Sequence, residues 1–265
     1  MSDPLRGRRL ARALLAAGLV ALGLLSVAFR LVAGFAVLDA LLVATLLGVV
    51  PLFALAQLPL VGELRVERLP AYWSSIGTIG LLGAACWLVG ARQGPAALGL
   101  VPMALPGLLA WSAGLTAIGL AIILVFRRLS IALGLEDAAL LRELLPRTAR
   151  ERRVFALLSA TAGFGEELAY RGYAIGALSP LLSPPGAAAL TSAVFGVVHC
   201  YQGPLGVVRT GLMGGALAWG FLASGSLWPA IVAHTLIDVL AGIVLGERLL
   251  SPRAPNGVQH APEVS

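Results

Sequence analysis

Long apolar windows constrain this chain more than any other feature of its sequence. About eight windows of roughly 20 predominantly apolar residues follow one another along it. Their approximate bounds are 11–30, 36–60, 71–91, 104–126, 154–178, 186–202, 205–224 and 227–246. Apolar residues make up 58% of the chain and charged residues 12%, against about 25% charged in soluble domains. The sequence therefore predicts an all-α, polytopic membrane helical bundle of about eight transmembrane helices.

The arginines predict the orientation of this bundle. All 19 basic residues are Arg, and most lie in segments that an eight-helix count places on one side of the membrane. Those segments are the N-terminus, 61–70, 127–153 and the C-terminal tail. Cytoplasmic loops carry an excess of basic residues, so we predict cytoplasmic N- and C-termini in a multi-pass protein of the cell membrane, such as a bacterial inner membrane. The net charge of +6 is accounted for in this way, and we predict no nucleic-acid partner.

One long polar connection divides the predicted bundle. Residues 1–126 form an N-terminal four-helix membrane segment, and 127–153 form a cytoplasmic amphipathic connection. Residues 154–246 form the C-terminal membrane helices, which carry the candidate catalytic residues, and 247–265 form a disordered tail. Leucines interleaved with Arg and Glu make the connection either a helix in the headgroup region or a solvated linker, interrupted at Pro146.

Three ionisable residues stand close together inside an apolar window. Glu166 and Glu167 are adjacent, and Arg171 follows in the run Gly-Glu-Glu-Leu-Ala-Tyr-Arg-Gly. At the centre of a bilayer each such group costs roughly 2.5–3.5 kcal/mol on insertion scales. Ionisable residues at this depth are typical of functional sites.

Further ionisable residues lie in the later windows. His199 closes the run Phe-Gly-Val-Val-His, and His234 and Asp238 bound the run His-Thr-Leu-Ile-Asp. Residues four apart share one face of a helix, so His234 should face Asp238, and Glu167 should face Arg171. Glu166 points elsewhere and is left without an obvious partner, which makes it the better candidate for a general base.

The predicted spans place these groups at different depths. At 1.5 Å per residue, Glu166 lies near mid-membrane, His199 near the cytoplasmic end and His234 in the outer half. These heights do not coincide unless the helices are tilted or shifted.

Three motifs in this order resemble the CPBP family of intramembrane proteases, also called Abi, which is related to the type II CAAX prenyl endopeptidases. The motifs are Glu-Glu-x-x-x-Arg at 166–171, Phe-x-x-x-His at 195–199 and His-x-x-x-Asp at 234–238. The resemblance covers about 150–245. It implies a membrane-embedded glutamic endopeptidase that hydrolyses a membrane-associated protein or peptide without a metal or other cofactor.

The resemblance also implies a role for each motif residue. Glu166 would activate water with the help of His199, Glu167 and Arg171 would organise the site, and His234 with Asp238 would stabilise the oxyanion. Many relatives carry Asn where this chain has Asp238, and an ionised Asp cannot donate a hydrogen bond. Asp238 would therefore either be protonated or orient His234.

Two other classes of function are compatible with the same residues. Glu166, His199, His234 and Asp238 are all competent zinc ligands, so the chain could be a zinc-dependent intramembrane protease. Buried ionisable groups also line paths in transporters, so a non-enzymatic membrane transporter or immunity protein is the second alternative. The glutamate–histidine peptidase remains the primary hypothesis, with a membrane substrate and the lipid bilayer as its partners.

Overall fold

The computed structural model describes residues 4–61, 66–135 and 138–250, which form helices and no strands. The predicted all-α class is confirmed over these residues. The α-helices are α1 (Pro4–Leu31), α2 (Val37–Ala44), α3 (Val50–Val61), α4 (Arg68–Gly90), α5 (Leu105–Ala132), α6 (Ala139–Glu143), α7 (Ala149–Glu167), α8 (Gly176–Val198), α9 (Pro204–Ser224) and α10 (Trp228–Val239). The π-helical segments are η1 (Thr45–Val49), η4 (Leu168–Ile175) and η6 (Leu240–Leu245), and the 3₁₀ segments are η2 (Ala91–Gln93), η3 (Pro95–Leu98), η5 (Cys200–Gln202) and η7 (Gly246–Leu249).

Helices long and apolar enough to span a membrane match the predicted windows. Within the described residues there are 7 such stretches, of which one, Ala149–Val198, covers one predicted window and most of the next. Its 50 residues would extend roughly 75 Å as a straight helix, more than twice the thickness of a bilayer core. Ser183 breaks this stretch with φ 62 and ψ 159, just before two prolines. The two halves therefore supply two passes, and the polytopic bundle is as predicted.

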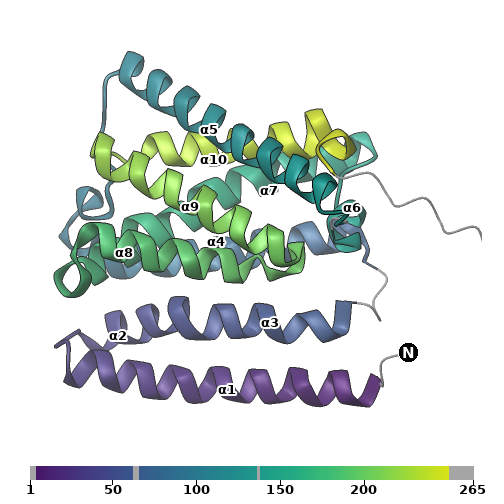
Figure 1. The fold of residues 1–265 in the computed structure, drawn as a ribbon. Helices are drawn as coiled ribbons and strands as arrows, with labels where there is room; N and C mark the ends of the chain where they lie inside the picture. Colours follow the sequence, from purple (N-terminus) through teal and green to yellow (C-terminus); the bar gives the residue numbers. More distant parts are fainter. Residues whose placement is uncertain (1–3, 62–65, 136–137, 251–265) are drawn as a thin grey trace, which may run out of the picture.

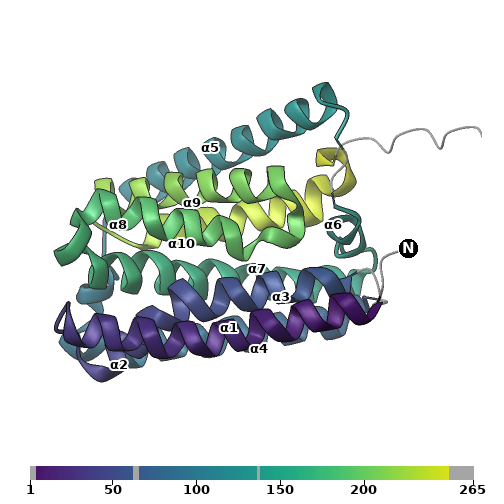
Figure 2. The same ribbon diagram turned by 60° about the horizontal axis from the view of Figure 1, so that its bottom comes forward.

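The long helices run roughly along one common direction (Figures 1 and 2). α1 and α3 lie side by side as an outer pair, and α4 packs on α7. α8 packs on α9, while α10 packs on α7, α5 and α9. Leu19 and Leu24 of α1 are exposed, as lipid-facing side chains must be. The π-helical segment η4 lies at the centre, where all eight of its residues are buried.

The two ends of the bundle differ in their arginines. The beginning of α1, the short helix α6 and the end of the described chain lie at the same end (Figures 1 and 2). There Arg68 Nε donates to the Leu145 carbonyl at 2.9 Å, and Arg68 Nη1 lies 3.9 Å from Glu151 Oε1. Arg-rich segments therefore gather at one end of the bundle. That this end faces the cytoplasm stays a prediction.

The connection between the two halves is shorter than the predicted 127–153. α5 continues to Ala132 and α7 already begins at Ala149, with only the short α6 between them. A capping box starts α7: Glu151 N–H donates to Thr148 Oγ1 at 3.1 Å, and Thr148 N–H donates to Glu151 Oε2 at 2.9 Å. At the other boundary, η7 is helical to Leu249, and residues 251–265 of the predicted tail lie outside the described residues.

Candidate active site

The glutamate doublet lies where α7 ends and η4 begins. Glu167 Oε1 lies 2.8 Å from Arg171 Nη1 and 2.8 Å from Nδ1 of His234 on α10. The side chains of Glu167 and Arg171 are 0% exposed. Since a carboxylate paired with arginine only accepts hydrogen bonds, Nδ1 of His234 is the donor. Glu167 thus holds the imidazole and fixes which of its two nitrogens faces the rest of the site.

The other two carboxylates face the opposite nitrogen of the same ring. His234 Nε2 lies 3.9 Å from Glu166 Oε2 and 3.8 Å from Asp238 Oδ2. The Glu166 side chain is 15% exposed and that of Asp238 37%, whereas Glu167 is sealed. Of the doublet, only Glu166 can therefore be reached by solvent. In the residues that the structure describes, no group of three or more His, Cys, Asp and Glu side chains is arranged to hold a metal ion.

Phe195 joins His199 to this cluster. The Arg171 guanidinium lies over the Phe195 ring at 4.4 Å from its centroid, a cation–π geometry. The His234 ring meets the same phenyl ring edge-on at 6.1 Å, and His199 lies 4.6 Å from it. Phe195 is thus the apolar centre around which the arginine and both imidazoles gather, a packing role that the spacing of its motif did not indicate.

His199 is fixed in one tautomer by the backbone. Its Nδ1 lies 2.8 Å from the carbonyl oxygen of Phe195 one turn earlier. A carbonyl can only accept a hydrogen bond, so Nδ1 carries the proton. In the neutral ring Nε2 is then a free acceptor, which suits a group that takes a proton or orients a water molecule.

The structure does not show the depth mismatch predicted from the sequence. Helix α7 begins at Ala149, five residues before the predicted window. Glu167 contacts His234 directly, and His199 and His234 both lie against the Phe195 ring, so the three motifs meet at one level. The predicted pairs Glu167–Arg171 and His234–Asp238 both form.

Glycines missed by the sequence analysis allow the helices around the site to approach closely. A Cβ on Gly163 of α7 would lie 2.9 Å from the Ile231 carbonyl of α10, and one on Gly83 of α4 would lie 3.0 Å from Cα of Gly165. Small residues permit such contacts between membrane helices. Gly163 therefore lets α10 come near enough for His234 to reach Glu167. The sequence contains 32 glycines, and composition alone does not indicate which of them lie at helix contacts.

Gly214 of α9 provides the space for the buried arginine. A Cβ there would lie 2.7 Å from Arg171 Nη2 and 3.3 Å from Phe195 Cδ1. We expect Gly214→Ala to displace the guanidinium and to lower the free energy of unfolding by about 1–3 kcal/mol. At Gly215, a Cβ would meet nothing within 4 Å, so Gly215→Ala should be neutral or stabilising by up to about 1 kcal/mol. Thermal unfolding in detergent compares the two, and equal stability of both variants would contradict this packing.

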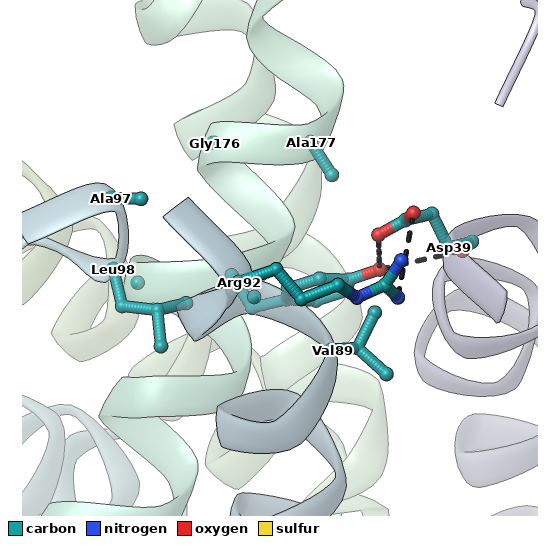
Figure 3. Close-up of a pocket in the computed structure, with 10 residues that line it drawn as sticks. Asp39, Val89, Arg92, Ala97, Leu98, Gly176 and Ala177 are labelled. Atoms are coloured by element: carbon teal, nitrogen blue, oxygen red, sulfur yellow. Dashed lines mark hydrogen bonds and ion pairs between the residues drawn. The ribbon is translucent and has the colours of Figure 1, made fainter. Parts of the chain in front are cut away.

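A second polar cluster lies apart from the predicted site residues. Tyr173 of η4 donates from its hydroxyl to Asp39 Oδ1 at 2.8 Å, and Arg92 Nη2 lies 3.9 Å from Asp39 Oδ2. Figure 3 shows Arg92 and Asp39 meeting, and both residues line a cavity of about 280 Å³. None of the six predicted site residues lines this cavity. The cluster ties α2 to the segment that carries Arg171, and sequence periodicity did not indicate it.

Fold and site together define a multi-pass membrane protein with a carboxylate–histidine cluster inside its helical bundle. Comparison with family models matches residues 150–240 to the family described as type II CAAX prenyl endopeptidase Rce1-like. The match includes all three motifs and confirms the resemblance to the CPBP family over this part of the chain. It supports a membrane-embedded CAAX-type endopeptidase in general. Neither the curated proteins nor the solved structures compared with the chain include a match.

Proposed function

We propose that this chain is an intramembrane endopeptidase that hydrolyses a peptide bond through water activated by glutamate and histidine. The observation that carries this proposal is the different environment of the two adjacent glutamates. Glu167 is sealed and bound to both Arg171 and His234, whereas Glu166 beside it is accessible. One carboxylate therefore holds the site together, and the other is available for chemistry.

Glu166 is the general base in this mechanism. It accepts a proton from water, and the resulting hydroxide attacks the carbonyl carbon of the scissile peptide bond. His199 assists, because its Nε2 is the free acceptor of a ring whose Nδ1–H is bound to the Phe195 carbonyl. The proton then passes from Glu166 to the leaving amine as the carbon–nitrogen bond breaks.

His234 acts on the oxyanion. With Nδ1 bound to Glu167, its Nε2 faces the reacting side, where it can donate to developing negative charge when protonated. Asp238 lies 3.8 Å from this nitrogen, and a nearby carboxylate favours the protonated ring. The geometry thus favours the orienting role for Asp238. Glu167 and Arg171 position His234 and touch no substrate.

The location of the cluster indicates the class of substrate. The site lies among membrane-spanning helices, so a substrate must enter from lipid or along the bundle. We therefore propose a membrane-associated protein or peptide as the substrate, and the cell membrane, such as a bacterial inner membrane, as the site of action. The Arg-rich end of the bundle is the proposed cytoplasmic end.

Substrate trapping tests the proposal. Tagged wild-type chain and Glu166→Gln are purified from native membranes in mild detergent, and peptides retained by each are identified by mass spectrometry. We expect the Gln variant to retain one or more peptides that wild type releases as fragments. Synthetic copies should be cleaved by wild type and not by Glu166→Gln. Peptides retained equally by both chains and cleaved by neither would favour the transporter or immunity-protein alternative.

The zinc alternative has its own test. His234, Glu166 and Asp238 approach one another, but a catalytic zinc needs three protein ligands converging on one point. The described residues contain no such group, so the side chains as arranged do not fit the metal. We expect hydrolysis to be unchanged by a strong chelator, and the purified chain to contain far less than one equivalent of zinc. Loss of activity with chelator, restored by zinc alone, would establish the metalloprotease instead.

A further inference from the structure

Tyr201 lies beside the site although it belongs to none of the three motifs. It is in η5, the 3₁₀ turn that follows α8, and its ring centroid is 5.9 Å from that of His199. This turn is followed by Gly203, whose φ of 83 suits glycine. Tyr201 therefore lies two residues after His199, in the turn that follows the second motif.

The hydrogen bonds of Gln202 determine where the proton of Tyr201 points. Arg209 Nη2 donates to Gln202 Oε1 at 2.8 Å, and Thr210 Oγ1 lies 3.2 Å from the same oxygen. Arginine can only donate, so the amide oxygen of Gln202 must face Arg209. Its Nε2 therefore donates to the Tyr201 hydroxyl oxygen, at 3.2 Å. The hydroxyl oxygen accepts from Gln202, and its own proton is left to bond elsewhere.

The charges around the phenol keep this proton in place. Burial, the largest cause, together with the negative charges of Glu166 and Asp238 raises the pKa of Tyr201 to about 12, against the opposing effects of Gln202 and Arg209. Tyr201 is thus within electrostatic reach of both accessible carboxylates. At neutral pH it is therefore an O–H donor, carried on a ring that lies beside the His199 imidazole.

The proposed mechanism lacks such a donor. When the hydroxide adds to the substrate carbonyl, the π electrons of the C=O bond move to oxygen, and that oxyanion requires hydrogen-bond donors. An ionised Asp238 cannot donate, which leaves His234 alone. We propose that the Tyr201 hydroxyl supplies the second hydrogen bond to the oxyanion, in place of the donor that an amide at position 238 would provide. The tyrosine keeps its proton throughout, and the bond is released when the carbonyl re-forms. This assignment rests on the proposed peptidase function.

Tyr201→Phe tests the assignment because it removes the hydroxyl and leaves the ring against His199. We expect kcat on a peptide that wild type cleaves to fall by about 10²–10³-fold, as for the loss of one oxyanion donor, with KM changed little. In an Asp238→Asn background, Tyr201→Phe should lower kcat by clearly less than it does in the wild-type background, because the Asn amide donates where Asp does not. Comparing the two backgrounds cancels any loss that comes from Asp238 itself. Tyr72→Phe is the matched control: it removes a hydroxyl bound to the Leu144 carbonyl near the Arg-rich end and should leave kcat unchanged.

The possible results separate the assignment from the function on which it rests. Wild-type kcat in Tyr201→Phe would overturn the assignment. An equal fold-loss of kcat from Tyr201→Phe in the wild-type and Asp238→Asn backgrounds would also overturn it, because it would mean that the hydroxyl acts only by holding Gln202 and its neighbours. Glu166→Gln serves as the separate control: full activity in that variant would overturn the peptidase mechanism itself, whatever Tyr201→Phe shows.

Discussion

Replacing Glu166 by Gln is expected to lower kcat by about 10³-fold on any peptide that the wild-type chain cleaves. Gln has nearly the same shape but cannot take a proton from water, and general-base catalysis contributes roughly 10²–10⁴-fold. Its partners should tolerate the change, because Glu166 is accessible and lies 3.9 Å from His234 Nε2 rather than in a tight pair. Single-turnover hydrolysis in detergent, followed by mass spectrometry of the products, gives the rate.

The neighbouring position provides the comparison. Glu167→Gln changes a sealed residue that holds His234 and Arg171, so we expect it to lower stability as well as activity. Glu166→Gln should instead keep the unfolding temperature of the wild type. If Glu166→Gln retained more than about a tenth of wild-type kcat, a base worth at least 10²-fold could not be assigned to this residue.

Much of the fold could be predicted because hydropathy and membrane thickness leave few choices. Each predicted window corresponds to a helix, and the two windows that overlap Ala149–Val198 are separated at Ser183, near the Gly/Pro-rich turn that the sequence already contains. The start of α7 was placed too late because Arg150, Arg152 and Arg153 lower the hydropathy there. The capping box from Thr148 to Glu151 was the signal that could have corrected it.

Contacts between site residues on the same helix could be predicted, whereas contacts between site residues on different helices could not. The i,i+4 rule gave Glu167–Arg171 and His234–Asp238. The hydrogen bond between Glu167 and His234 joins residues 67 positions apart, and it depends on the packing of α10 on α7 and on their close approach at Gly163. Neither leaves a periodic signal in one sequence. The contact of Tyr201 with His199 was not predicted for the same reason. Tyr201 lies in a turn after α8, where the periodicity of a helix does not apply.

Breaking the buried ion pair is expected to have the largest effect on stability. Arg171→Met leaves Glu167 charged, sealed and without its cation, and removing one partner of a buried pair typically costs about 3–5 kcal/mol. Glu167→Gln combined with Arg171→Met removes both charges, so the double variant should lose clearly less stability than the sum of the two single changes. Unfolding by denaturant titration in detergent, followed by circular dichroism, measures the three variants.

Arg92→Met is the matched control for this experiment. The same substitution removes a cation that lies 3.9 Å from Asp39, but the Arg92 side chain is 47% exposed and that of Asp39 29%. Exposed pairs contribute about 0–1 kcal/mol, so this variant should unfold almost as wild type does. If Arg171→Met were no more destabilising than Arg92→Met, Glu167 would have to be uncharged in the folded protein. The ion pair between Glu167 and Arg171 would then not be what holds His234 in place, because a neutral carboxyl forms no ion pair with arginine.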